Sequence, residues 1–361
     1  MESTENLTPL NVEQLANLLL RAYLAMVRSG TPFQKFPSVM LWGPPGVGKS
    51  QAVRQIAAAL EQGTGRRVAV TDVRLLLFNP VDLRGIPAAN ADRTLAVWLK
   101  PKIFQMDESE NVLNLLFLDE ISAAPPSVQA AAYQITLDRM VGEHRLPENC
   151  IVIAAGNRVT DKSVAYNMPK ALANRLCHFE VAVDAAAWHR WALRAGVHPF
   201  VTGYLEYNPA ALMRFDPSGT QLAFPTPRSW EMVSSILNTI SADVTEVYPL
   251  MAGCIGEETA YPFKTWCGLY EKLPDPAVIF AGEEAAVPKA PELRLALRSA
   301  LAAYARQRPE QAGLDHAIAY ACRLPWEFRR GFLRDCNQIP ALRPLLKQNE
   351  VFRTALQKGL Q

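Results

Sequence analysis

Two patterns of hydrophobic residues follow one another along the chain and meet near residue 185. In the first part, short apolar runs predict buried strands at residues 38–42, 67–73, 112–118 and 150–155. Apolar residues at helical spacing predict helices at residues 11–29, 51–60 and 126–137. Near-continuous apolar strands that alternate with helices are typical of a parallel sheet with helices on both faces. The first part is therefore predicted to be a three-layer α/β/α domain.

Helical spacing dominates the second part of the chain, beginning at residues 185–193. A group of prolines predicts a linker or loop there, at Pro274, Pro276, Pro288 and Pro291. From Glu292 onward the pattern is helical again. We therefore predict three domains: an α/β domain at residues 1–185, a helical domain at residues 186–273 and a helical C-terminal extension at residues 274–361.

Two segments of the first part combine turn residues with apolar flanks, which predicts β-hairpins. The first lies within residues 82–103 and includes Trp98, and the second covers residues 139–146 with Gly142 near its tip. Trp98 and His144 are candidates for contact with a partner molecule. The alternatives are a tryptophan in the core and a histidine in contact with solvent.

Residues 43–50 read Gly-Pro-Pro-Gly-Val-Gly-Lys-Ser, which fits the phosphate-binding pattern G-x-x-x-x-G-K-[ST]. The segment lies between a predicted strand and a predicted helix, as this pattern requires. The backbone N–H groups of such a loop and the N-terminal end of the next helix bind a polyphosphate. Lys49 can reach the outer phosphates, and the Ser50 hydroxyl can ligate Mg²⁺. The predicted nucleotide-binding residues are Gly43, Pro44, Pro45, Gly46, Val47, Gly48, Lys49, Ser50 and Gln51.

Polar side chains also follow two of the predicted strands. Asp119 and Glu120 end the run Leu-Leu-Phe-Leu, and Asn157 follows the strand at residues 150–155. In parallel sheets, ligands bind at the carboxyl ends of the strands. Asp119 is therefore predicted to hold Mg²⁺ together with Ser50, and Glu120 to orient and polarise the attacking water. Asn157 is predicted to hydrogen-bond the water or the terminal phosphate, although an asparagine that only forms a turn is an alternative.

Composition and charge give limited information about the class of protein and its cellular compartment. Of the 361 residues, 49% are hydrophobic, and the net charge of +2 does not single out a nucleic-acid-binding protein. The six cysteines form no C-x-x-C pair, which favours free thiols in a reduced compartment. No apolar run approaches the ~20 residues of a membrane span, and the N-terminus lacks the order of a signal peptide. A cytoplasmic protein without a membrane span is expected.

The order of these motifs resembles that of AAA+ ATPases, and within them the MoxR group. Residues 43–50 are similar to the Walker A motif, and residues 115–120 to Walker B. Asn157 matches the sensor 1 position of the family. Arg175, in the segment Leu-Ala-Asn-Arg-Leu, is similar to its arginine finger, and Arg228, in Thr-Pro-Arg-Ser, to its sensor 2. The resemblance covers roughly residues 10–240.

The chain departs from the family pattern at two of these motifs. Leu176 stands where the family usually has phenylalanine after the finger arginine. The family's usual Thr-Gln-Asn-Pro around sensor 1 is Ala-Gly-Asn-Arg here, so Arg158 stands in place of proline. The last third of the chain matches no known pattern.

The resemblance implies a P-loop AAA+ core with a parallel sheet, followed by an α-helical lid and a helical extension. It implies ATP and Mg²⁺ as cofactors, and catalytic roles for Glu120, Asn157, Arg175 and Arg228. A guanidinium next to the transferred phosphoryl group accelerates its transfer. MoxR-type proteins act as hexameric rings that remodel or assemble protein clients, commonly with a partner that carries a von Willebrand factor A domain.

Two other functions use the same ATPase core. One is a nucleic-acid-associated motor or loader, which the modest net charge without a long basic stripe disfavours. The other is a nucleotide-dependent switch with little turnover, which the combination of Glu120, Asn157 and Arg175 disfavours. The sequence does not identify the client, the ring size, the role of the C-terminal extension or the preference for ATP over GTP.

Overall fold

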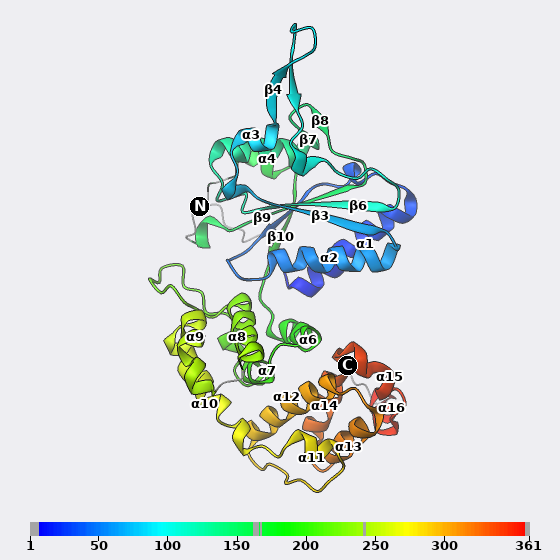
Figure 1. Cartoon of the computed structure of the whole chain (residues 1–361), viewed down its shortest axis with the longest axis vertical. Helices are drawn as coiled ribbons and strands as arrows, with labels where there is room; N and C mark the ends of the chain where they lie inside the picture. Colours follow the sequence, from blue (N-terminus) through cyan, green and yellow to red (C-terminus); the bar gives the residue numbers. More distant parts are fainter. Residues whose placement is uncertain (1–6, 162–165, 167, 241–242, 358–361) are drawn as a thin grey trace. The chain divides into compact units, whose positions relative to one another are not determined.

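The structure is a computed structural model that describes residues 7–161, 166, 168–240 and 243–357. Its contacts divide the chain into two units, Met1–Val183 and Asp184–Gln361 (Figure 1). The first unit contains strands and helices, and the second is helical. The predicted boundary of the α/β domain at residue 185 stays a prediction. A further division of the second unit into a lid at residues 186–273 and an extension at residues 274–361 stays a prediction.

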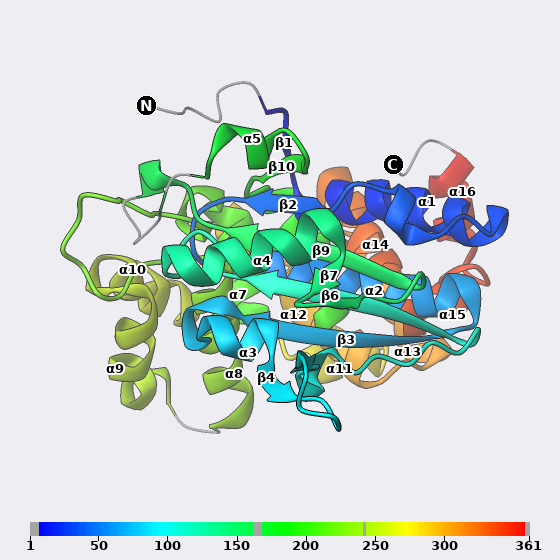
Figure 2. The ribbon, with the colours of Figure 1, turned by 90° about the horizontal axis from the view of Figure 1, so that it is seen from above.

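A six-stranded sheet forms the centre of the first unit (Figure 2). The strands run in the order β1-β10-β2-β9-β6-β3, and every neighbouring pair is parallel. Their bounds are β1 Pro9–Leu10, β2 Val39–Trp42, β3 Arg67–Arg74, β6 Val112–Asp119, β9 Cys150–Gly156 and β10 Cys177–Val181. The predicted parallel sheet is confirmed, and its four predicted strands are β2, β3, β6 and β9. Sequence analysis missed β1 and β10, because β1 has two residues and β10 mixes polar with apolar side chains.

Helices cover both faces of this sheet (Figure 1). They are α1 Val12–Ser29, α2 Lys49–Thr64, α3 Pro80–Arg84, α4 Pro126–Asp138 and α5 Lys170–Ala173. Along β6, Leu115 packs into a core with α1 and α2, whereas Leu116 packs into a second core with α4. Because side chains alternate across a strand, a strand buried on both faces is apolar along its whole length. The predicted three-layer arrangement is confirmed.

Two β-hairpins lie beside the sheet, as predicted. One pairs β4 (Ile86–Ala89) with β5 (Ala96–Leu99) and projects from the domain, and the other pairs β7 (Met140–Val141) with β8 (His144–Arg145) (Figure 1). The two hairpins contact each other, since Nε2 of His144 lies 2.7 Å from the carbonyl oxygen of Trp98. Both of these side chains are half-buried, so His144 is not simply a solvated residue.

The second unit is helical, and its first helix packs into an apolar core with the helices from residue 276 onward. The bounds of its helices are α6 Ala185–Ala195, α7 Pro199–Tyr207, α8 Pro227–Thr239, α9 Val244–Ile255, α10 Glu257–Cys267, α11 Pro276–Phe280, α12 Pro291–Gln307, α13 Gln311–Ala321, α14 Trp326–Gln338, α15 Arg343–Leu346 and α16 Glu350–Gln357. Two prolines predicted to lie in a linker or loop, Pro276 and Pro291, instead begin α11 and α12. Proline fits the first helical turn because its missing N–H would have no partner there. Among the described residues, no helix combines the length and apolarity that a membrane crossing needs.

Candidate active site

The glycine-rich loop joins the end of β2 to the start of α2, as the sequence predicts. Gly48 is the residue before the helix and has a φ of 107°, in the left-handed region. A side chain there would be strained, and its Cβ would lie 3.0 Å from the side chain of Val12. Glycine at this position therefore lets the chain turn sharply into α2, whose N-terminal end faces the loop.

The ammonium group of Lys49 lies within hydrogen-bonding distance of both the loop and β9. Its Nζ donates to the carbonyl oxygens of Gly43 at 2.6 Å and Pro44 at 3.1 Å, and to Oδ1 of Asn157 at 2.8 Å. Lys49 is buried, with 9% of its surface exposed. An ammonium group has three N–H donors, so a polyphosphate in the loop would compete with these acceptors.

Ser50 and Asp119 form the second contact between the loop and a strand end. The Ser50 hydroxyl donates to Oδ2 of Asp119 at 3.1 Å, and Asp119 ends β6. Mg²⁺ prefers oxygen ligands in an octahedron at 2.0–2.1 Å, so two adjacent ligands lie about 2.9 Å apart. The chemistry and spacing of these two oxygens fit Mg²⁺, and this pair is the predicted metal site.

Asp72 is a further acidic residue near this end of the sheet, and sequence analysis missed it. It belongs to β3, which pairs with β6 along its whole length. Partial burial raises the pKa of Asp72, and the neighbouring Asp119 carboxylate raises it further, whereas Arg74 and Arg54 act in the opposite direction. The only signal in the sequence is one acidic residue within an apolar strand, which solvent exposure alone would explain.

Glu120 follows Asp119 with an unusual backbone conformation. Its φ is 60°, in the left-handed region that residues other than glycine seldom occupy. Its N–H donates to Oδ1 of Asp119 at 2.9 Å, and the next N–H, of Ile121, donates to the carbonyl of Ala155 at 2.9 Å. The strand therefore ends in a sharp turn. Strained residues of this kind cluster at functional sites.

Asn157 is held between the loop and the segment after β6. Its N–H donates to Oγ of Ser122 at 2.9 Å while its amide oxygen accepts from Lys49. This approach requires glycine at position 156, because a Cβ there would lie 2.7 Å from Oγ of Ser122. The structure thus brings Lys49, Ser50, Asp119 and Asn157 together at one end of the sheet, in two hydrogen-bonded groups.

The two predicted arginines lie outside these groups. Arg175 is exposed in the turn after α5, and its N–H donates to the carbonyl of Leu172 at 3.1 Å. Arg228 is exposed near the start of α8, in the second unit. Its helix begins at Pro227, because Thr226 and Ser229 form a capping box and Pro227 fits the first turn. The roles of both arginines stay predictions.

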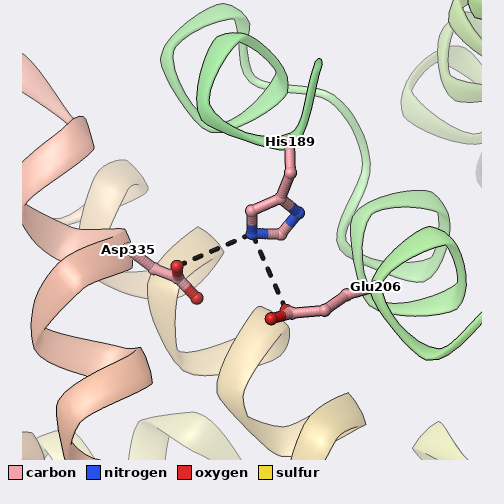
Figure 3. A group of neighbouring side chains, drawn as sticks. All are labelled: His189, Glu206 and Asp335. Carbon is pink, nitrogen blue, oxygen red and sulfur yellow. Dashed lines mark ion pairs between the residues drawn. The ribbon is translucent and has the colours of Figure 1, made fainter. Parts of the chain in front are cut away.

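A second group of charged residues lies in the helical unit. Nε2 of His189 lies 3.7 Å from Oε2 of Glu206 and 3.6 Å from Oδ1 of Asp335 (Figure 3). These residues come from α6, α7 and α14. Because they are far apart in the sequence, no local spacing could have revealed them.

Two guanidinium groups already neutralise the carboxylates of this group. Arg298 of α12 contacts Glu206 and places its Nε 2.8 Å from Oδ2 of Asp335, and Nη2 of Arg334 lies 3.6 Å from Oε1 of Glu206. Burial raises the pKa of Asp335, but Arg298 and His189 outweigh it, so the pKa lies below its usual value. Two negative and two positive charges cancel, which argues for a structural ion-pair network and against a cation site.

Comparisons with known proteins agree with the geometry of the first unit. Residues 38–178 match the family model described as "ATPase family associated with various cellular activities (AAA)". No curated protein matches the chain. The site geometry and this match together identify an ATP-hydrolysing domain.

Several solved structures are similar at low sequence identity. One is a Cytophaga hutchinsonii protein assigned as an ATPase, with 16% identity, a TM-score of 0.33 and coverage of 95% of this chain and 88% of that chain. Another is Thermotoga maritima RuvB, with 17% identity, a TM-score of 0.37 and coverage of 72% and 68%. A third is a Thermotoga maritima protein related to the DNA polymerase III gamma subunit, with 9% identity, a TM-score of 0.33 and coverage of 94% and 89%. At these scores the likeness carries no argument about function.

Proposed function

We propose that the AAA-family ATPase domain formed by residues 38–178 couples ATP hydrolysis to the remodelling or assembly of a protein client, in the manner of the MoxR group. The observation that carries the proposal is the meeting of two hydrogen-bonded groups at one sheet end. One joins Lys49 to Asn157, and the other joins Ser50 to Asp119. This arrangement provides a cation for the outer phosphates, oxygen ligands for Mg²⁺ and an amide for the terminal phosphate.

Each residue of the site has a separate role in hydrolysis. Lys49 would bind the outer phosphates, and Ser50 and Asp119 would hold the Mg²⁺ that neutralises their charge. Glu120 would orient the attacking water and accept its proton, and its left-handed backbone forms the sharp turn directly after Asp119. Asn157 would hydrogen-bond the water or the terminal phosphate.

Arg175 suits a site that is completed by a second copy of the chain. It is exposed, and none of the contacts described above involves its guanidinium. An arginine supplied to a neighbouring subunit stabilises the charge that develops on the transferred phosphoryl group. We therefore propose a ring, hexameric by analogy with the MoxR group, in which Arg175 acts on the neighbour's ATP. Arg228 would bind the nucleotide of its own subunit and transmit movement of the helical lid.

The projecting hairpin favours a protein client over a nucleic acid. Ile86 and Leu99 face each other across β4 and β5 and are 65% and 57% exposed, and Leu95 at the turn is 67% exposed. An exposed apolar surface of this kind is typical of sites that bind proteins, whereas nucleic acids require basic and stacking side chains. A partner with a von Willebrand factor A domain and a cytoplasmic location follow from the resemblance to the MoxR group.

Substitution of Glu120 tests the proposed chemistry. Glu120→Gln keeps the size of the side chain but removes the proton acceptor, so turnover should fall about 10²–10⁴-fold while ATP still binds. Steady-state phosphate release and calorimetric ATP binding measure the two effects. The exposed Glu110 on the same unit provides the control, as Glu110→Gln should leave turnover unchanged. Unchanged turnover in Glu120→Gln would refute the role of Glu120.

Nucleic acid and subunit mixing test the rest of the proposal. ATPase rates that rise with DNA or RNA, and rise less as salt increases, would favour a motor or loader instead.

Mixing Arg175→Ala subunits with Lys49→Ala subunits should recover some activity from two inactive samples. If no activity returns, the proposed site between subunits loses its support.

A further inference from the structure

Arg158, which replaces the proline that commonly follows the sensor 1 asparagine, makes an unusually large set of contacts. Its guanidinium binds Asp161 through Nη2 at 3.0 Å and Glu180 through Nη1 at 2.5 Å. Its backbone N–H also donates to Oδ2 of Asp161 at 2.8 Å. The Arg158 side chain is 23% exposed and that of Asp161 only 4% exposed. These are partly buried, charge-assisted contacts, which are stronger than surface ion pairs.

The contacts of Arg158 cross the end of the strand that leads into the phosphate loop. The strand order places β2 between β10 and β9, and the register aligns Glu180, Trp42 and Gly156. Arg158 follows β9 by two residues, so its bond to Glu180 on β10 passes over the end of β2. The phosphate loop begins at this end, with Gly43 directly after Trp42.

The charge of Arg158 is well compensated within this group. Burial lowers the pKa of Arg158, but hydrogen bonds and charges from Asp161 and Glu180 outweigh it, so the pKa rises above its usual value. Asp161 is part of a short 3₁₀-helix, Val159–Asp161, directly after Arg158. The guanidinium therefore joins three parts of the first unit: β10, the end of β9 and the turn that follows it.

We call the contacts of Arg158 with Asp161 and Glu180 the Arg158 clamp. Asn157 lies between this clamp and its own hydrogen bond to Ser122. Its N–H is held by Ser122 at 2.9 Å, and its side-chain oxygen accepts from Lys49 at 2.8 Å. The position of the backbone and the hydrogen-bond partners of the side chain together limit the directions in which an amide can point. Fixing the backbone on both sides of Asn157 therefore fixes the direction in which the amide points, which favours reaction at a site that requires accurate placement.

We propose that Arg158 is a positioning residue that holds the Asn157 amide in the direction needed for hydrolysis. Arg158 acts through Asn157 and contacts neither ATP nor the attacking water. This inference rests on the proposed role of Asn157 in hydrolysis. Outer residues that orient groups at a reaction centre commonly change activity about 10–100-fold, and Arg158 is expected at the lower end of this range.

A double-mutant cycle in the full-length protein separates positioning from general stabilisation. We expect Arg158→Met to lower kcat about tenfold with KM for ATP changed less than about twofold. Asn157→Ala should lower kcat by more, and the double variant should match Asn157→Ala within about twofold, because the residue that Arg158 positions is then absent. Independent, multiplied losses of kcat in the double variant would overturn the proposal, and so would unchanged kcat in Arg158→Met.

Further variants keep the test valid if Arg158→Met fails to fold. Glu180→Gln weakens one arm of the clamp and should lower kcat a few-fold, again only when Asn157 is present. Arg67→Met is the matched control, since it removes a surface ion pair with Asp107 whose arginine is 65% exposed, and it should leave kcat unchanged.

The cycle also separates the two proposals. Full activity of Asn157→Ala would refute the role of Asn157 itself, and the positioning role with it. Reduced activity of Asn157→Ala, combined with normal activity of both Arg158→Met and Glu180→Gln, would refute only the role of Arg158.

Discussion

The polar site at the sheet end and the ion-pair network of the helical unit both contain acidic and basic side chains, but they differ in how these charges are compensated. At the sheet end, Ser50, Asp119 and Asn157 are half-buried and hydrogen-bonded in a geometry that fits a cation and a phosphate. In the helical unit, the carboxylate of Asp335, which lies beside His189 and Glu206 (Figure 3), is 2% exposed and is already bound by Arg298. Charged residues that neutralise one another, as in the helical unit, stabilise the fold. Polar residues whose geometry fits a cation and a phosphate, as at the sheet end, can bind a ligand.

Removing one charge from the buried network should give the largest effect. Asp335→Asn leaves the buried Arg298 without one of its two carboxylate partners, and breaking such a pair destabilises by about 3–5 kcal/mol. Urea unfolding followed by the fluorescence of the tryptophans measures this loss. Glu327→Gln, an exposed residue on the same helix, is the control and should change the free energy of unfolding by less than about 0.5 kcal/mol. Equal stability of Asp335→Asn and Glu327→Gln would show that the network is not structural.

The equivalent change at the sheet end should reduce activity instead. Lys49→Ala removes the cation proposed for the outer phosphates, so ATP turnover should fall about 10²–10³-fold. Phosphate release at saturating ATP measures this loss, with the exposed Lys35→Ala as the control. If Lys49→Ala destabilised the fold as strongly as Asp335→Asn but retained turnover, the contrast between the two groups would be wrong.

The stability that the buried network provides should depend on pH. Because the folded-state pKa of Asp335 lies below its value in the unfolded chain, its stabilising effect is complete above about pH 4. This effect is lost as the pH falls through the lower folded-state pKa. The difference in urea midpoint between the wild-type protein and Asp335→Asn should therefore shrink as the pH falls below about 4. A difference that does not shrink below about pH 4 would contradict this assignment.

Asp72 should give the smallest effect. Its carboxylate lies near Asp119 and adds negative charge to the proposed Mg²⁺ site, but it is exposed and screened by water. Asp72→Asn should raise the Mg²⁺ concentration needed for half-maximal ATPase activity about two- to fivefold. Asp92→Asn, at the turn of the projecting hairpin, is the control. A shift of a hundredfold or more would make Asp72 a direct ligand.

The sequence predicted the parts of the fold that depend on local pattern. Strand β6 is apolar along its length and was predicted, whereas β10, with His178 and Glu180, carries no such pattern. The loop at residues 43–50 was predictable because its motif is local. The ion-pair network was not, because His189, Glu206 and Asp335 meet only when the helices pack.

In the candidate site, too, some contacts were predictable from local sequence and others were not. Ser50 and Asp119 were predicted to act together, and the structure places them 3.1 Å apart. The clamp around Arg158 depends on Glu180, which belongs to a strand that sequence analysis missed. A residue that acts through another becomes visible only when both partners have been placed by the fold.

The left-handed backbone at Glu120 has a consequence for how this protein can change under selection. Such a conformation costs a residue with a side chain about 1–2 kcal/mol, whereas glycine adopts it freely. Selection of variants for thermal stability alone would therefore enrich Glu120→Gly, which should be more stable but should lack ATPase activity. Thermally stabilised variants of this protein should be assayed for phosphate release before their melting temperatures are compared.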